Sequence, residues 1–316
     1  MTSDTPVSET VQLQSNRPAH FRKAIVFCCD ANYLPFAMHA ADRIVQFAGE
    51  RDFDVCVCHG VQDISIPQSL DYLDVRRCHI DTGDSFEGLR LDRGRTSDVY
   101  LRIALPAAFA EDYDRILYMD ADIFVQGGDF SALLDVDLGP HAIAAVRDNV
   151  QWRTPTRQNA RNTMQSVPAS GYFNAGIMLM DVHAYREQQL MDRCIAIGRK
   201  HRETLKRHDQ NLYTAVLLDD WAELSPMWNW QFSKAARLFS TLVSPHVIHF
   251  IGPAKPWKDR EGQFEPLFLE SDQRDIKEHF PQHKLAPEPS KRLSPDSFVV
   301  TQMIVKHLIA QRKRAR

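Results

Sequence analysis

The sequence predicts an α/β fold in which a mostly parallel sheet is flanked by helices. Two patterns support this. Short apolar runs of strand length recur along the chain, and segments with apolar residues at helical spacing lie between them. The runs are continuously apolar rather than alternating, as in strands buried on both faces. Such sheets bind ligands at the carboxyl ends of their strands, so the polar residues that follow each run are the site candidates.

The elements can be assigned in chain order. Ala24–Cys29 predicts the first strand, and Leu34–Ala48 predicts the first helix because its apolar residues recur every three or four positions. Further strands are predicted at Phe53–Cys58, Val75–Ile80, Arg115–Met119, Ala142–Val146, Gly176–Met180 and Val247–Phe250. Further helices are predicted at Asp98–Phe109, Val182–Lys200 and Asp209–Leu218.

Composition narrows the function classes. The 316 residues, 44% hydrophobic and 25% charged, are typical of a globular protein. A net charge of −3 gives no electrostatic attraction to nucleic acid, so we expect no nucleic-acid partner. None of the six cysteines forms a C-x-x-C pair, and we expect buried thiols in a reducing compartment. No secretory signal and no apolar run of roughly 20 residues is visible, which predicts a soluble or peripheral protein. No pattern specifies an oligomeric state.

The chain divides into three parts. Residues 1–20 are rich in Ser, Thr, Gln and Pro and predict a disordered lead. Residues 21–282 carry the predicted elements and form one domain. Residues 283–316 begin Pro-rich and end with apolar residues four apart followed by basic ones. Such a tail fits a peripheral contact with an anionic membrane, and it fits equally a helix packed on the core with a solvated basic end.

The sharpest motif is Asp120-Ala121-Asp122, directly after the strand Arg115–Met119. Two carboxylates one residue apart at a strand end can converge on one cation, and their hard oxygens suit Mn²⁺ or Mg²⁺. A cation held there can neutralise a diphosphate. Taken alone, the motif fits a solvated turn equally well.

A second motif, His249–Trp257, follows the last predicted strand. The imidazole of His249 is a candidate third metal ligand. Gly252 allows close approach of a phosphate to the backbone, and Lys255 supplies a positive charge. Taken alone, His249 fits a buried core histidine better.

Together these motifs make the chain resemble glycosyltransferase family 8, the retaining enzymes that include glycogenin and bacterial lipopolysaccharide α-galactosyltransferases. The resemblance covers most of residues 23–260 with the motifs in the family's order. It implies a Rossmann-like, GT-A type nucleotide-sugar-binding fold. It also implies transfer of galactose or glucose from a UDP-sugar to a carbohydrate or glycolipid acceptor, in lipopolysaccharide or other surface-polysaccharide synthesis. The expected location is the cytoplasm, with peripheral contact at the inner membrane face through the tail.

The resemblance also implies residue roles. Asp120, Asp122 and His249 would hold Mn²⁺ (or Mg²⁺), with Ala121 beside the donor. Gly252 and Lys255 would contact the diphosphate. The remaining nucleotide contacts, in the loop that grips uridine, would be Asp30, Asn32 and Tyr33. From the residues alone, this loop fits an N-capping turn before the helix.

The remaining matches surround the sugar. Arg102, Asp148 and Asn174 would face the donor sugar, Asp209 would bond one of its hydroxyls, and Gln210 would lie beneath the anomeric carbon. Asn211 stands where some relatives have an aspartate, which leaves no obvious carboxylate nucleophile there. We therefore expect acceptor attack from the leaving-group face.

Two alternatives remain open at this point. A phosphatase of the haloacid dehalogenase type also places D-x-D after an apolar strand, usually near the start of the domain. A non-catalytic nucleotide-sugar-binding protein would keep the fold and lose the chemistry.

Overall fold

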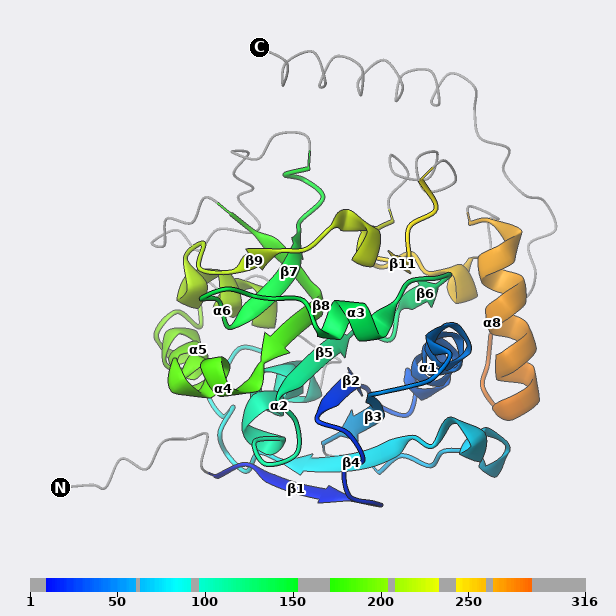
Figure 1. The fold of residues 1–316 in the computed structure, drawn as a ribbon, viewed down its shortest axis with the longest axis horizontal. Helices are drawn as coiled ribbons and strands as arrows, with labels where there is room; N and C mark the ends of the chain where they lie inside the picture. The colour runs from blue at the N-terminus through cyan, green and yellow to red at the C-terminus, as the bar shows by residue number, and fades with distance from the viewer. Residues whose placement is uncertain are drawn as a thin grey trace, which may run out of the picture.

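The structure, a computed structural model, describes residues 10–60, 63–91, 97–152, 171–203, 208–232, 243–259 and 264–285. Its centre is an eight-stranded sheet in the order β1-β4-β3-β2-β5-β8-β7-β9 (Figure 1). The strands are β1 (Gln12–Ser15), β2 (Lys23–Cys28), β3 (Asp54–His59), β4 (Arg76–Asp81), β5 (Arg115–Met119), β7 (Ile143–Arg147), β8 (Phe173–Asp181) and β9 (Ala222–Glu223).

The predicted mostly parallel sheet is confirmed. Strands β4, β3, β2 and β5 run parallel to one another, and β7 runs parallel to β9. Only β8 and β1 pair in the antiparallel sense, β8 with both β5 and β7, and β1 with β4. Strand β2 is apolar from Ala24 to Cys28 and β3 from Val55 to Cys58, as expected where both faces of a sheet are covered.

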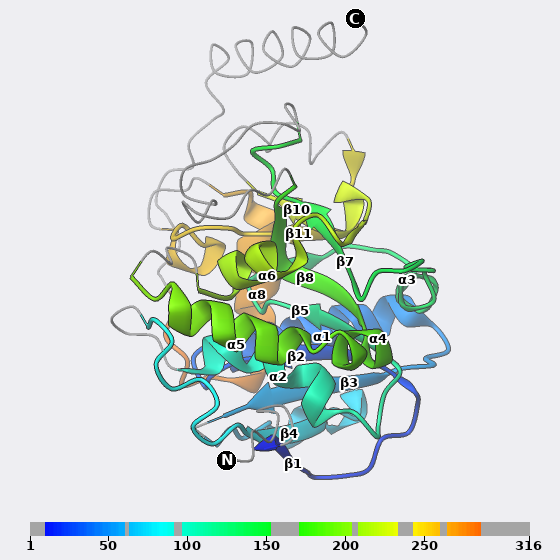
Figure 2. The same ribbon diagram turned by 90° about the vertical axis from the view of Figure 1, so that its left-hand side faces the viewer.

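Helices cover both faces (Figures 1 and 2). On one side lie α1 (Leu34–Ala48), α3 (Phe130–Leu134) and α8 (Pro266–His279). On the other lie α2 (Leu101–Ala108), α4 (Val182–Glu187), α5 (Leu190–Lys200) and α6 (His208–Leu217). Each side has its own apolar cluster, to which alternate residues of the central strands contribute, as Ile25 and Val26 of β2 illustrate. The sheet is thus the middle layer of a three-layer domain.

A small second sheet brings the residues of the candidate site together. It consists of β10 (Trp230–Gln231), β11 (Val247–His249) and β6 (Ile123–Val125), in that order. Residues 120–122 form the turn by which the chain leaves β5 of the large sheet and enters β6 of the small one. Strand β11 pairs antiparallel with β6, with His249 opposite Ile123. The junction between the sheets therefore brings two distant segments of sequence together.

The predicted elements recur with three main differences. The helix expected over Val182–Lys200 is two helices, because Gln189 adopts a left-handed backbone conformation with φ +52°. The strand expected at Val247–Phe250 belongs to the small sheet. The segment expected to be helical over Asp98–Phe109 begins as a 3-10 turn, Ser97–Tyr100, before α2.

Disorder was expected over residues 1–20, and this is wrong for residues 12–15. Gln12–Ser15 forms β1, which pairs with β4. An edge strand gains backbone hydrogen bonds without an apolar pattern, so its polar sequence gave no signal. The following segment is held by Asp54, whose carboxylate accepts from Arg17 (2.8 Å) and from the backbone N–H of His20 (2.8 Å). Residues 1–9 and most of the 283–316 tail lie outside the described residues.

All six cysteines are free thiols, and five of them are buried, as expected. Among the residues that the structure describes, no helix is long and apolar enough to cross a membrane.

Candidate metal and nucleotide-sugar site

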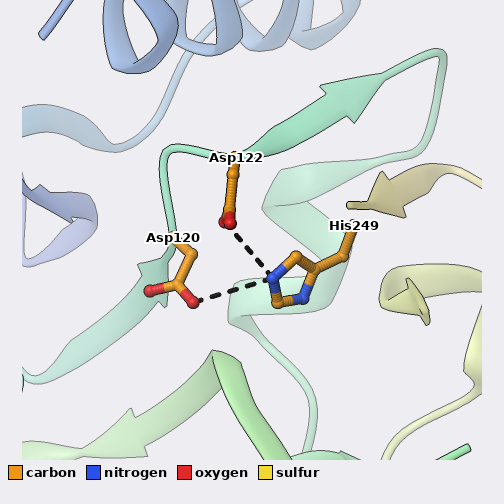
Figure 3. Close-up of side chains that lie close together, drawn as sticks. All are labelled: Asp120, Asp122 and His249. Carbon is orange, nitrogen blue, oxygen red and sulfur yellow. Dashed lines mark ion pairs between the residues drawn. The ribbon is translucent and has the colours of Figure 1, made fainter. Parts of the chain in front are cut away.

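Asp120, Asp122 and His249 converge at the junction of the two sheets (Figure 3). Nε2 of His249 lies 3.3 Å from Oδ1 of Asp122 and 3.7 Å from Oδ2 of Asp120. One ligand atom from each residue lies within 4.8 Å of the other two. Two carboxylate oxygens and an imidazole nitrogen around one point suit Mn²⁺ or Mg²⁺, so the residues present fit a divalent cation.

The backbone fixes this geometry. The N–H of Asp120 donates to the carbonyl of Gly176 on β8 (2.7 Å), and the N–H of Phe250 donates to the carbonyl of Asp122 (3.0 Å). Gly176 leaves the space that the site occupies. A Cβ on Gly176 would lie 2.2 Å from Cε1 of His249 and 2.7 Å from Oδ2 of Asp120. The expectation that Gly176 starts a strand is wrong, since β8 already begins at Phe173. Its close packing follows from these distances.

The two carboxylates have opposite electrostatic environments. Burial raises the pKa of Asp120, and the neighbouring Asp122 adds to this, while Arg102 and His249 offset only part of it. Burial would also raise the pKa of Asp122, but His249 and Lys255 outweigh burial and hold that pKa well below its usual range. A cation at this position would relieve the repulsion between two half-buried carboxylates.

The predicted diphosphate contacts lie beside the metal ligands. The ammonium of Lys255 is buried, and it donates to Asp122 and to the carbonyl of Phe250. Gly252 has φ +82°, a conformation that favours glycine, and it is exposed. The loop thus needs Gly252 for its backbone, and Lys255 is in direct contact with Asp122.

The predicted uridine loop lies next to the same segment. The edge of the Tyr33 ring faces Trp257 with centroids 6.4 Å apart, and Phe36 stacks on Trp257 at 3.9 Å. One carboxylate oxygen of Asp30 accepts from the backbone N–H of Asn32 (2.9 Å) and Tyr33 (3.0 Å). Asp30 therefore closes the turn that precedes α1, whose N-cap residue, Tyr33, makes no side-chain capping bond. The other carboxylate oxygen of Asp30 accepts from Nδ2 of Asn32 at 3.5 Å. Asn32 is exposed.

Arg102 connects the metal ligands to the predicted sugar contacts. Its guanidinium lies 3.0 Å from Oδ1 of Asp120 and 3.1 Å from Oδ2 of Asp209, and it also donates to the carbonyl of Ala175 (3.0 Å). It stacks over the ring of Tyr118 at 4.5 Å, and the hydroxyl of Tyr118 donates to Asp120 (2.5 Å). Burial opposes the charge of Arg102, but the two carboxylates raise its pKa well above the usual value.

A second pair lies on the α6 side. Nε2 of Gln210 donates to Oδ2 of Asp148 at 3.5 Å, which joins the residue after β7 to the start of α6. Asn211, the next residue, is buried, and its side-chain oxygen accepts from the hydroxyl of Tyr172 (3.1 Å). The oxygen of Asn211 thus bonds within the core, while its Nδ2 is buried without a hydrogen-bond partner among the described residues.

Asn174 has a structural role that the sequence did not predict. Its Oδ1 accepts from the N–H of Gly176 (3.0 Å) and from Nδ2 of Asn229 (3.0 Å), so this oxygen already has two protein donors. Asn229 is fully buried and bonds Nδ1 of His249 (3.1 Å). Sequence reasoning missed Asn229 and Tyr118. The one signal for Asn229 was an amide between two tryptophans, where a buried polar group requires partners. Ala121, between the two aspartates, is buried.

Comparisons with known proteins identify related sequences and structures. The sequence model of Glycosyl transferase family 8 matches residues 24–261. General stress protein A of Bacillus subtilis is 34% identical over 177 residues, which is 51% of this chain and 59% of that protein. The lipopolysaccharide glucosyltransferase WaaO of Escherichia coli is 27% identical over 201 residues, 60% of this chain and 58% of the other. The lipopolysaccharide 1,3-galactosyltransferase of Salmonella typhimurium is 30% identical over 174 residues, 51% and 50% of the two chains. These matches span about half to three fifths of each relative's length.

Solved structures share the fold. An active-site mutant of LgtC superposes with a TM-score of 0.64 at 21% identity, over 84% of this chain and 98% of the other. The bifunctional glycosyltransferase WbbM superposes with a TM-score of 0.63 at 20% identity, over 85% of this chain and 51% of the other. The predicted GT-A type architecture is confirmed. Because the family's sequence model spans well over half of its residues, the chain belongs to glycosyltransferase family 8.

Proposed function

We propose that this protein is a metal-dependent, retaining hexosyltransferase. It transfers galactose or glucose from a UDP-sugar to a carbohydrate or glycolipid acceptor in the synthesis of lipopolysaccharide or another surface polysaccharide. The observation that carries the proposal is the convergence of Asp120, Asp122 and His249 beside Arg102. The names of the lipopolysaccharide glucosyl- and galactosyltransferases among its relatives support the sugar class. The comparisons lend no support to a phosphatase or to a non-catalytic binding protein.

Asp120, Asp122 and His249 would hold the cation. When bound, a Mn²⁺ or Mg²⁺ ion neutralises charge on the departing diphosphate. Lys255 contacts one oxygen of Asp122 and the carbonyl of Phe250. From this position its ammonium would supply positive charge to a diphosphate oxygen.

Arg102 and Asp209 would orient the sugar. The guanidinium already holds the Asp209 carboxylate at 3.1 Å, which fixes that carboxylate as an acceptor for a sugar hydroxyl. The same guanidinium holds Asp120, so the sugar-binding and metal-binding carboxylates share one anchor. This arrangement would hold the donor sugar and the diphosphate at a fixed separation.

Gln210 would face the anomeric carbon through its carbonyl oxygen. Its amide nitrogen donates to Asp148, which directs the oxygen away from that carboxylate. As the sugar–phosphate bond breaks, positive charge develops at the anomeric carbon as in glycoside hydrolysis, and an amide oxygen stabilises that charge without forming a lasting bond. Retention then follows from acceptor attack on the leaving-group face, with a diphosphate oxygen taking the acceptor proton. A trapped sugar adduct on Asp148 or Asp209 would contradict this mechanism.

The proposed function is tested by screening UDP-sugars for UDP release with and without Mn²⁺. UDP-galactose or UDP-glucose should give Mn²⁺-dependent release, and Asp120→Asn should reduce it by about 10²–10³-fold, the usual cost of one lost transition-state contact. Equal release from the variant, or none from any donor with acceptor sugars present, would refute the proposal.

The cellular location is part of the same proposal: cytoplasmic, with the basic tail of residues 283–316 against the inner membrane face. Co-sedimentation with anionic liposomes tests it. The full chain should pellet, and a chain ending at Asp296 should stay in the supernatant. Equal behaviour of the two would contradict membrane contact through the tail.

A further inference from the structure

We propose that Asn229 and Asn174 fix the tautomer of His249, so that its Nε2 presents a lone pair to the metal. The four groups involved form an amide relay: the N–H of Gly176, the side chains of Asn174 and Asn229, and the imidazole of His249. The inference rests on the proposed function, because it assigns two positioning residues to the metal site of that function.

The relay starts from a group that can act only as a hydrogen-bond donor. The backbone N–H of Gly176 can only donate, and it lies 3.0 Å from the side chain of Asn174. The atom facing it must be the oxygen of Asn174. That same oxygen lies 3.0 Å from the side chain of Asn229, so the Asn229 atom facing it must be the nitrogen.

The orientation of Asn229 then determines His249. With its nitrogen directed at Asn174, Asn229 turns its oxygen to Nδ1 of His249, at 3.1 Å. An amide oxygen only accepts, so Nδ1 must carry a hydrogen. The other ring nitrogen, Nε2, is the one that faces Asp122 and Asp120, at 3.3 and 3.7 Å. One backbone N–H thus dictates, through two amides, which nitrogen can bind the metal.

Burial makes this arrangement hard to replace. Asn229 is 0% exposed, His249 4% and Asn174 6%, so solvent cannot substitute for a lost partner. The strands hold the register, because Trp230, next to Asn229, pairs with Ile248, next to His249. Metal-bound histidines commonly donate their other N–H to such a partner, which fixes the ring and its tautomer.

Loss of Asn229 should favour the wrong tautomer. Without an acceptor at Nδ1, the imidazole hydrogen is better placed on Nε2, where it can donate to the Asp122 carboxylate 3.3 Å away. A hydrogen on Nε2 occupies the lone pair that the metal needs. Asn229→Leu keeps the number and branching of the side-chain heavy atoms and removes the acceptor, and it should weaken Mn²⁺ binding about 10–100-fold.

Three further variants isolate the relay. Asn174→Leu does not alter any group touching His249, yet it frees the Asn229 amide to turn, so it should also weaken Mn²⁺ binding. Asn174→Asp keeps an oxygen for both donors and should not weaken it. The matched control is Gln231→Leu, a fully buried amide two residues from Asn229 that bonds the Arg147 carbonyl and the Asn149 N–H instead. Its Mn²⁺ affinity should equal that of the wild type.

The experiment measures Mn²⁺ affinity by electron paramagnetic resonance, without donor or acceptor, for all five proteins. In parallel, ¹⁵N-histidine-labelled, metal-free protein is examined by NMR. The signal of His249 is identified by comparing the wild type with Asn229→Leu. The wild type should show a slowly exchanging Nδ1–H on His249, and Asn229→Leu should lose it.

The outcomes separate the relay from the proposed function. A His249 protonated only at Nε2 in the wild type, or wild-type Mn²⁺ affinity in Asn229→Leu, would overturn the relay. Absence of Mn²⁺ binding by the wild type would refute the metal site of the proposed function, while the NMR result would still decide the tautomer.

Discussion

Gly176→Ala should disable the metal site while leaving the fold in place. Gly176 lies within β8, and its backbone conformation is one that alanine can adopt, since its φ is not positive. The obstacle is space. The new Cβ would lie 2.2 Å from Cε1 and 2.8 Å from Nδ1 of His249, and 2.7 Å from Oδ2 of Asp120.

The magnitude follows from these distances. Carbon atoms in contact prefer about 3.5–4.0 Å, so the imidazole must retreat by more than 1 Å or the strands must part. His249 cannot retreat freely, because Asn229 holds Nδ1 and β11 is paired with β6. Metal–ligand distances tolerate only about ±0.2 Å, so we expect Mn²⁺ affinity to fall at least 100-fold. Overpacking should also cost about 1–3 kcal/mol of stability.

The assay is Mn²⁺ titration followed by electron paramagnetic resonance, with circular dichroism as the check on folding. The matched control is Gly127→Ala, just after β6. Its new Cβ would meet its nearest neighbour, Nδ1 of His246, at an ordinary 4.0 Å, and Gly127 has no positive φ. This control should bind Mn²⁺ like the wild type. Wild-type Mn²⁺ affinity in folded Gly176→Ala would refute the steric reasoning.

Three other perturbations test separate parts of the structure. Arg102→Leu removes the guanidinium that pairs with both Asp120 and Asp209, so kcat/KM for the donor should fall about 10²–10³-fold. An unchanged kcat/KM would show that Arg102 does not contribute to catalysis. Gly252→Ala forces a side chain into φ +82°, at a cost of about 1–2 kcal/mol, and should raise the donor KM; an unaltered KM would show that this backbone conformation is not needed. Burial would raise the pKa of Asp54, but its hydrogen bonds lower it, so its contribution to stability is complete above the ordinary pKa of about 3.9 and is lost as pH falls through the folded value. The free energy of unfolding, measured by chemical denaturation from pH 7 to pH 2.5, should fall in the wild type and fall less in Asp54→Asn. An equal fall in both proteins would contradict this role of Asp54.

The central elements were predictable because single physical signals dominate them. Strand β5 and helix α1 were predicted with their observed bounds, since one is a continuous apolar run and the other has a clear helical period. Strands β9 and β10 have two residues each, too few to show any period. Their presence depends on partners that the chain supplies elsewhere.

The residues of the candidate site also divide into those that the sequence predicts and those that it does not. The metal ligands and Lys255 were predictable because their chemical types and order along the chain match one family. The contribution of Asn229 was not, because an asparagine has no assigned role until β10 is known to lie beside β11. For Asn174, the sequence predicted a sugar contact and gave no sign of a second role, in which its oxygen accepts from Gly176 and Asn229 behind His249.

The central claim is that one cation, held by Asp120, Asp122 and His249, creates the binding site for the nucleotide diphosphate. Calorimetric titration of UDP into the protein, in Mn²⁺ and then in EDTA, tests it most directly. We expect UDP to bind the wild type tightly in Mn²⁺ and at least 100-fold more weakly in EDTA, as expected for a lost metal-mediated contact, and to bind His249→Ala weakly in both. Equal affinity of the wild type for UDP in Mn²⁺ and EDTA would contradict the account.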